Sequence, residues 1–502
     1  MLYETKLAEL KQQVSRLEYI KYTLNSLIYW DKITYMPKDG IQYRSKVMSF
    51  LADEQYKLFS GENFIKLVDY FDGHPKNDRV TNAMVGRIKR NSHYVNLVPE
   101  EEYADYIQLI AVAEQVWENA KAKDDFQSFQ PYLEKIVATF RKFAEYWKYE
   151  DNPYDALMGY YEEGLTVKFI DETIVPVKNF LIEMINRIKA EGRTPERASI
   201  DFSADAASQQ LLWQSALSKL GFDFNRGRID LGAHPTILAS SPFDVRIVNT
   251  YDEKDLKVGF SNVLHSAGKG IYQQSIDPAL LGTFLAEVPS FVMEESIGRL
   301  YENIFGRSRG FCDYFIEDIQ TAAPQLKNLT AETLYERINE LKPSPVRMEA
   351  DELTYLLHII IRYELERDLI SGLIEVKDLP QLWSQKYMEY LGVEPKNSRE
   401  GVLQDIHWAA GYMGYFPCYF VSNLSAAQLS AAISQDEGDF DRLIARGEFS
   451  RVNGWLREHI YRHGAVYSSE SLVEQATGEP LSAKYYIDYL RKKYSEVYKL
   501  NS

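Results

Sequence analysis

The sequence predicts a mainly α-helical protein with one small β-sheet. Apolar residues recur every three to four positions in long segments such as EEYADYIQLIAVAEQVWENAKAK (101–123) and LTYLLHIIIRYELERDLISGLI (353–374), which are longer than strands usually are. The exception lies between residues 222 and 251. That region is rich in turn-forming residues, and its end, DVRIVNTY (244–251), alternates in the manner of a short strand.

The N-terminal 30 residues predict an amphipathic helix, because charged residues separate apolar residues at helical spacing. They do not resemble a signal peptide, and no apolar run in the chain reaches the ~18 to 20 residues of a membrane span. The two cysteines, Cys312 and Cys418, are too far apart in sequence to suggest a disulfide framework. We therefore expect a cytoplasmic protein that does not act at a membrane.

The composition is that of a globular chain with ample volume for a core: 502 residues, 45% hydrophobic and 26% charged. The net charge of -16, without a run of lysine and arginine, argues against a nucleic-acid partner.

The segment NVLHSAGKGIYQQS (262–275), which follows the turn-rich region 222–251, is built like the metal-binding helix of a peptidase. In an H-E-x-x-H helix, two histidines four residues apart hold zinc on one face while the glutamate activates a bound water. The five positions here read His265, Ser266, Ala267, Gly268 and Lys269. One histidine remains, and the glutamate is replaced by serine.

Several blocks, in order along almost the whole chain, resemble the carboxypeptidase Taq family of zinc metallocarboxypeptidases. They are WDKITYMPKDG (30–40), GRIDLGAHPT (227–236), DVRIVNTYDEKD (244–255), EESIGRLYENIFGR (294–307), VRMEADELTYLLHIIIRYELE (346–366) and GVLQDIHWAAGYMGYFPCY (401–419). The resemblance implies a zincin-like peptidase fold with a deep cleft, in which the small sheet lies beside the active-site helix. It divides the chain into residues 1–200, helices that cover the cleft, and residues 201–502, a catalytic-type body continuous with them. It also implies a homodimer.

The resemblance places His265 at the first zinc ligand, Ser266 at the catalytic glutamate, Lys269 at the second histidine and Glu295 at the carboxylate ligand. The scaffold blocks are retained, while departures gather around the chemistry: Glu294 for a histidine, Ile297 and Gly298 for glutamine and serine, Val248 and Thr236 for threonine and phenylalanine, and Thr250 for a common arginine. Lys269 would repel zinc and pair with Glu295, and with Glu294 if it is near. We therefore expect no bound metal, no cofactor and no functional catalytic residue.

Three functions remain open. The first is a pseudopeptidase whose cleft binds peptides or another protein without cutting. The second is an active metal-dependent carboxypeptidase with an unorthodox site of His265, Glu294 and Glu295. The third is a hydrolase in which Ser266 is activated by Lys269, three residues away on the helix.

The family positions that line the cleft suggest contacts for a peptide with a free C-terminus. Arg246 and Arg347 could hold its carboxylate bidentately, or each could form a structural salt bridge, for Arg347 with Asp351 or Glu352. The other matching positions are His234, His407 and Tyr419. A packing role is at least as good an interpretation of His407 and Tyr419, and His234 is expected to shape the turn before the strand. That strand offers an edge to which an extended peptide could add.

Overall fold

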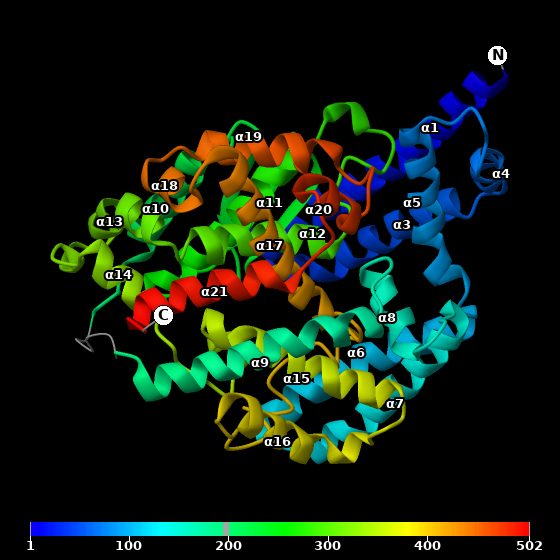
Figure 1. Cartoon of the computed structure of the whole chain (residues 1–502). Coiled ribbons are helices and arrows are strands. Elements are labelled where there is room, and N and C mark those ends of the chain that lie inside the picture. Colours follow the sequence, from blue (N-terminus) through cyan, green and yellow to red (C-terminus); the bar gives the residue numbers. More distant parts are fainter. Residues whose placement is uncertain (1, 194–199, 501–502) are drawn as a thin grey trace. The chain divides into compact units, whose positions relative to one another are not determined.

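The computed structural model describes residues 2–193 and 200–500, and helices dominate the described chain (Figure 1). The mainly helical fold predicted from the periodicity is confirmed. The chain forms two compact units, and each is assembled from separate stretches of sequence. The first unit comprises Met1–Asn91, Ala198–Tyr335 and Ser425–Leu481, and the second comprises Ser92–Arg197, Glu336–Leu424 and Ser482–Ser502. The sequence-based division at residue 200, and the deep cleft, stay predictions.

The first unit contains the N-terminal helices, the sheet and the helices that carry the peptidase-like motif. Its elements, which include the π-helical turns η1 and η4, are α1 (Leu2–Tyr22), η1 (Thr23–Tyr29), α2 (Trp30–Thr34), η2 (Lys38–Gly40), α3 (Ile41–Phe59), α4 (Glu62–Phe71), α5 (Arg79–Asn96), α10 (Ala206–Leu220), β1 (Gly227–Leu231), β2 (Thr236–Ser241), β3 (Asp244–Asn249), α11 (Leu256–Ser275), η3 (Pro278–Leu280), α12 (Phe291–Arg299), η4 (Leu300–Phe305), α13 (Arg309–Ala322), η5 (Pro324–Leu326), α14 (Ala331–Ile338), α18 (Phe440–Ala445), α19 (Phe449–His459), η8 (Tyr461–His463) and α20 (Ser469–Thr477). Helices α5 and α14 run across the boundary into the second unit.

The second unit is built around α15 (Glu352–Ile370), a helix in which nearly every residue is buried. Helices α7, α8, α9 and α16 pack against it, and α21 packs against α9. The remaining bounds in this unit are α6 (Glu100–Lys123), α7 (Phe126–Trp147), α8 (Pro153–Tyr161), α9 (Val167–Glu191), η6 (Arg347–Glu349), η7 (Val376–Asp378), α16 (Leu379–Leu391) and α21 (Ala483–Tyr498), while α17 (Phe416–Glu437) crosses the boundary at residue 424.

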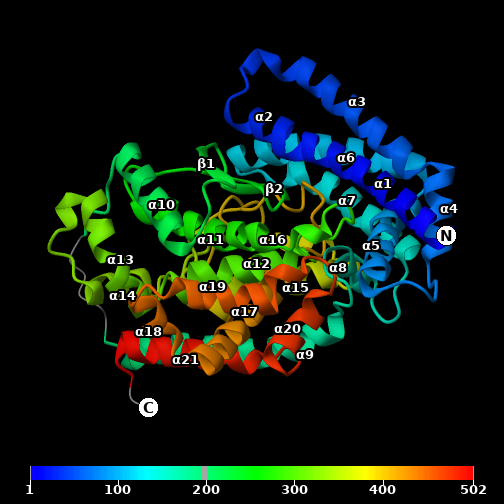
Figure 2. The same ribbon diagram turned by 90° about the horizontal axis from the view of Figure 1, so that it is seen from above.

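The sheet has the strand order β1-β3-β2, with β1 parallel and β2 antiparallel to β3. The strand predicted at DVRIVNTY is therefore confirmed as β3, but it is the central strand, so the expectation that it offers a free edge is wrong. Both of its edges are hydrogen-bonded within the sheet, and only β1 and β2 lie at the sides. Helix α11 packs against β2 and β3 (Figure 2), on the face where Val245 and Ile247 are completely buried.

Helix α11 begins where the side chain of Asp255 accepts a hydrogen bond from the backbone N–H of Lys257, which satisfies one of the donors left open at a helix start. It approaches α12 and η4 closely because residue 268 is glycine. A β-carbon there would lie 2.7 Å from a ring carbon of Tyr301 and 2.8 Å from the carbonyl oxygen of Ile297. This close packing brings the HSAGK and EESIGR segments together. Within the described residues, no helix combines the length and apolarity that crossing a membrane requires.

Candidate functional site

The charged groups of HSAGK and EESIGR meet between α11 and α12. Lys269 Nζ lies 2.9 Å from Glu295 Oε2, and His265 Nε2 lies 3.3 Å from the same oxygen. The predicted pairing of Lys269 with Glu295, with His265 facing the same space, is therefore confirmed. The Lys269 ammonium and the His265 imidazole thus both contact one oxygen atom of the Glu295 carboxylate.

The 3.3 Å between His265 Nε2 and Glu295 Oε2 can be compared with the spacing of two zinc ligands. Two donor atoms on one tetrahedral zinc, each about 2.0–2.1 Å from the metal, lie about 3.3 Å apart. This separation suits a ligand pair and equally suits the direct ion pair that the two groups form. Among residues 2–193 and 200–500, however, no group of three or more histidine, cysteine, aspartate or glutamate side chains is arranged to hold a metal ion.

Further polar and charged side chains from α11, α12 and the π-helical turn η4 surround Lys269, His265 and Glu295. Arg299 Nε donates to Glu295 Oε1 at 2.9 Å, and Arg299 Nη1 donates to Glu302 Oε2 at 3.2 Å. Glu302 Oε2 also lies 3.0 Å from His265 Nδ1. The hydroxyl of Ser261 donates to the other oxygen of Glu302 at 3.0 Å. A carboxylate on Nδ1 leaves the opposite ring nitrogen of a neutral histidine free for a metal. Here that nitrogen faces the Glu295 carboxylate, to which it donates when the imidazole is doubly protonated, a state that the raised pKa of His265 favours.

The pKa values follow from this arrangement. Burial lowers the pKa of Lys269, but the charge of Glu295 outweighs it, so the pKa is raised. The pKa of His265 is also raised for the same two opposing reasons. Burial would raise the pKa of Glu295, yet Lys269 brings it well below its ordinary value. Likewise, Arg299 overcomes the effect of burial on Glu302 and lowers its pKa to about 2. Lys269 is therefore an ammonium and both carboxyl groups are ionised at neutral pH.

Two small residues complete the site. Ser266, which the resemblance places at the catalytic glutamate, is buried on α11. Gly298 lies beneath the imidazole: a β-carbon at this residue would lie 2.5 Å from His265 Cε1. A larger residue would displace the ring, so the position of His265 depends on glycine at 298.

The predicted contact residues of the first unit lie at the sheet. His234 is exposed in the connection between β1 and β2, as expected of a turn residue. Arg246, on β3, donates to both oxygens of Asp244, at 2.8 and 2.9 Å, and its guanidinium lies 4.4 Å from the ring centre of Trp30. Arg246 therefore forms a salt bridge within β3, as one of its two interpretations predicted, and its role in holding a peptide carboxylate stays a prediction.

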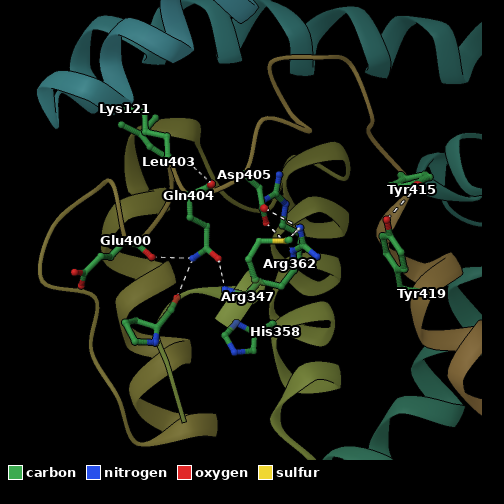
Figure 3. Close-up of polar contacts among 12 residues, drawn as sticks. Lys121, Arg347, His358, Arg362, Glu400, Leu403, Gln404, Asp405, Tyr415 and Tyr419 are labelled. Carbon is green, nitrogen blue, oxygen red and sulfur yellow. Dashed lines mark hydrogen bonds and ion pairs between the residues drawn. The ribbon is translucent and has the colours of Figure 1, made fainter. Parts of the chain in front are cut away.

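The other predicted arginine, Arg347, belongs to the second unit and forms a bidentate ion pair with Asp405, both bonds being 2.9 Å (Figure 3). The completely buried guanidinium of Arg362 approaches Asp405 at 3.4 Å. Asp351 and Glu352 are not its partners, so that expectation is wrong. Asp351 caps α15 by accepting from two backbone N–H groups, and Glu352 pairs with Lys493 of α21.

Gln404 attaches the loop that carries Asp405 to the segment before α15. Its side chain accepts from the backbone N–H of Arg347 at 2.8 Å and donates to the carbonyl of Pro345 at 3.0 Å (Figure 3). The GVLQDIHW block therefore fixes where Arg347 points.

His407 and Tyr419 pack among aromatic rings of the second unit. The ring of His407 stacks on Tyr415 and meets Phe416 edge-on, with centroids 5.8 and 4.8 Å apart. Burial lowers the pKa of His407 to about 3. The hydroxyl of Tyr419 donates to that of Tyr415 at 3.2 Å (Figure 3).

Arg299 and Glu302 were not expected as members of the site, and Gly298 was expected only as a departure near the chemistry. The signal was present, because Arg299 and Glu302 follow Glu295 by four and seven residues and so share its helical face. Asp405 and Arg362 were missed as well. They lie 58 and 15 residues from Arg347, and helical periodicity carries no information at such separations.

Comparisons with known proteins agree with this fold. The family model described as carboxypeptidase Taq (M32) metallopeptidase matches residues 9–494. Carboxypeptidase 1 of Bacillus subtilis (strain 168) is 39% identical over 477 residues, which are 95% of each chain. Thermostable carboxypeptidase 1 of Pyrococcus furiosus is 34% identical over 473 residues, 93% of this chain and 94% of the other.

Solved structures extend the likeness to three dimensions. The M32 carboxypeptidase of Deinococcus radiodurans R1 superposes with a TM-score of 0.95 at 31% identity, covering 99% of this chain and 100% of the other. A Pyrococcus furiosus carboxypeptidase structure gives a TM-score of 0.94 at 33% identity, covering 97% and 99%. With the family model and curated relatives spanning nearly all of its length, this chain belongs to the carboxypeptidase Taq (M32) family of metallopeptidases.

Proposed function

We propose that this chain is a pseudopeptidase, a family member that keeps the peptidase scaffold but binds no zinc and does not hydrolyse peptides. The observation that carries the proposal is the ion pair of Lys269 with Glu295, at 2.9 Å. The ammonium occupies the side of the carboxylate that faces His265, and it supplies positive charge where the family positions would place a dication.

The side chains at the family's ligand positions do not fit zinc. Of the three, Lys269 is protonated, because the net shift of its pKa is upward, and an ammonium has no lone pair to give to a metal. A zinc ion between His265 and Glu295 would also lie beside the Lys269 ammonium in a buried site, where repulsion between like charges is strong. Only one imidazole and one carboxylate remain, fewer than the three protein ligands of catalytic zinc sites.

The same charges weigh against the two alternatives. In a hydrolase using Ser266, Lys269 would have to accept the serine proton, which a protonated ammonium cannot do. In an unorthodox site of His265, Glu294 and Glu295, a metal would compete with Lys269 and Arg299 for the Glu295 carboxylate. No base stands at position 266 to take a proton from a bound water.

What the scaffold could still do is bind a peptide with a free C-terminus without cutting it. Arg347 is the best candidate for the carboxylate, because its ion pair with Asp405 uses Nε and Nη2 and not Nη1. A guanidinium held rigidly in this way loses little freedom when it binds a carboxylate. The net charge of -16 supports neither a nucleic acid nor an anionic membrane surface as partner. We also propose that the protein is cytoplasmic.

The test is a carboxypeptidase assay on peptides with free C-termini, with and without a chelator and with added zinc. The proposal expects no chelator-sensitive release of C-terminal residues above background. Turnover that the chelator abolishes would reject it and support the unorthodox metal site. Turnover that resists the chelator and is lost in Ser266→Ala would instead support the serine hydrolase.

A further inference from the structure

Three buried nitrogen atoms of the second unit have no hydrogen-bond partner among the described residues. They are Arg362 Nη2, His358 Nε2 and Trp383 Nε1, and their side chains are only 1–2% exposed. A buried donor without an acceptor is costly, and more so when the donor is charged. Three of them close together therefore point to an acceptor that the chain itself does not supply.

The three side chains meet where α15 packs against α16. His358 and Arg362 are four positions apart on α15, and so share one helical face. Trp383 and Tyr387 have the same spacing on α16, and their rings stack 5.3 Å apart. The guanidinium carbon of Arg362 lies 5.6 Å from the ring centre of Trp383, and the ring centres of His358 and Tyr387 are 5.2 Å apart. The three nitrogens thus belong to side chains packed together in one part of this interface.

The hydrogen bonds around His358 make its Nε2 a donor. Gln404 Nε2 donates to the hydroxyl oxygen of Tyr387 at 3.5 Å, which directs the hydroxyl proton to His358 Nδ1, 2.9 Å away. Burial lowers the pKa of His358 to about 3, so the ring is neutral at pH 7 and carries its single proton on Nε2. The side chains of Arg362 and Trp383 have donors only. All three nitrogens therefore present N–H groups.

The positive charge of Arg362 is incompletely balanced. Its Nη1 and Nε lie 3.4 Å from Asp405 and Glu366, which is longer than the ~2.9 Å of an ordinary N–H···O bond. Asp405 is engaged more closely by Arg347, in two bonds of 2.9 Å (Figure 3). Glu366 accepts bonds of 2.7 Å from a tyrosine hydroxyl and an indole. Burial lowers the pKa of Arg362 despite both carboxylates, and it raises the pKa of Glu366.

We propose that the α15–α16 interface binds one chloride ion through Arg362 Nη2, His358 Nε2 and Trp383 Nε1. A chloride ion accepts hydrogen bonds from all three donors. A water molecule would have to donate its own hydrogens as well, and the nearby carboxylates already accept shorter bonds. A metal cation would meet three donors and no lone pair.

The size of the ion follows from the burial of its three contacts. A carboxylate or phosphate attached to a larger molecule needs an opening to solvent, whereas a monatomic ion can be enclosed completely. Because Arg362 also contacts Asp405, the ion would stabilise the guanidinium that lies behind the Asp405–Arg347 pair. The inference is independent of whether the chain binds zinc or cuts peptides.

The first experiment measures the melting temperature of the full chain in sodium chloride, sodium bromide and sodium gluconate at equal ionic strength. Chloride and bromide should raise it saturably, by about 2–4 °C, because they bind the native state. Gluconate is too large to enter the interface and should not. The dependence on concentration gives an apparent dissociation constant for each halide. Equal melting temperatures in the three salts would overturn the proposal.

Trp383→Phe removes one N–H group and keeps an aromatic ring. It should raise the apparent dissociation constant for chloride about tenfold, because a hydrogen bond to a charged group is lost. Trp213→Phe is the matched control: Trp213 is 1% exposed and its Nε1 likewise has no partner among the described residues, but it belongs to the first unit. This control should leave the constant unchanged. Equal constants for the two variants would contradict the assignment of Trp383.

A direct measurement needs no variant. Crystals of the wild-type chain grown in sodium bromide should show an anomalous-scattering peak between Arg362, His358 and Trp383. Electron density for a water molecule at this position, without an anomalous peak, would overturn the proposal.

Discussion

The imidazole of His265 lies over the α-carbon of Gly298, so close that a β-carbon at residue 298 would stand 2.5 Å from the ring. In this position the ring reaches Glu302 with one nitrogen and Glu295 with the other. Gly298 and Lys269, both of which the resemblance marks as departures from the family blocks, contact the same cluster around Glu295: Gly298 through the imidazole of His265 and Lys269 directly.

Replacing Gly298 with alanine should therefore destabilise the protein. The added methyl has to push the imidazole away from Glu295 and Glu302, and overpacking of this kind costs about 1–3 kcal/mol. Chemical denaturation at neutral pH measures the effect. Gly454→Ala in α19 is the control, because a β-carbon there meets nothing within 4 Å and alanine favours a helix by about 0.5–1 kcal/mol. Equal changes for both variants would show that the ring does not need residue 298 to be glycine.

Placing a histidine at residue 269 should restore zinc binding. Lys269→His removes the ammonium and adds an imidazole four residues from His265, so this variant should bind about one zinc per chain without gaining activity. Adding Ser266→Glu supplies the base, and the double variant should release C-terminal residues in a zinc-dependent way. Ser266→Glu alone keeps Lys269 and should bind no zinc.

Metal analysis after dialysis and a peptidase assay separate these outcomes. If Lys269→His stays free of zinc, the ammonium is not what keeps the metal out. Zinc binding without turnover in the double variant would place a further loss among the other departures, at Val248, Thr250 and Glu294.

Acid should destabilise the second unit through His358, which is buried, and His407, which is half-buried. Burial lowers the pKa of His358, as of His407, to about 3, whereas an unfolded histidine titrates near 6.5. Between these values the unfolded chain binds more protons, so the free energy of unfolding falls as pH falls, by up to about 1.4 kcal/mol per pH unit for each histidine. The loss begins as pH drops through about 6.5.

Urea denaturation at several pH values from 7 to 4 measures this slope. His358→Gln should reduce the slope by about 1.4 kcal/mol per pH unit, whatever it does to stability at pH 7. An unchanged slope would mean that His358 is not held neutral by burial. The matched substitution at an exposed histidine outside the second unit is His234→Gln.

The parts of the structure that were predictable depend on local pattern or on opposite charge. Helical periodicity and the alternation of DVRIVNTY specified element type, because side-chain burial repeats with the backbone geometry. The position of β3 within the sheet was not predictable, since strand order depends on hydrogen bonds between distant segments. The resemblance placed Lys269 and Glu295 at neighbouring ligand positions, and their opposite charges then predicted the ion pair. Arg347 was expected to pair with nearby acids, but Asp351 is engaged as a helix cap and Glu352 with Lys493, which leaves Asp405.

The central claim is that Lys269 stands where zinc would be held. It is tested most directly by measuring the zinc content of the purified wild-type chain by mass spectrometry. The sample is first equilibrated with a slight excess of zinc and then passed through gel filtration. The account predicts well under one zinc per chain, and no rise in melting temperature when zinc is added, since a ligand that binds the native state tightly would raise it. One zinc per chain, lost on substituting His265, would contradict it.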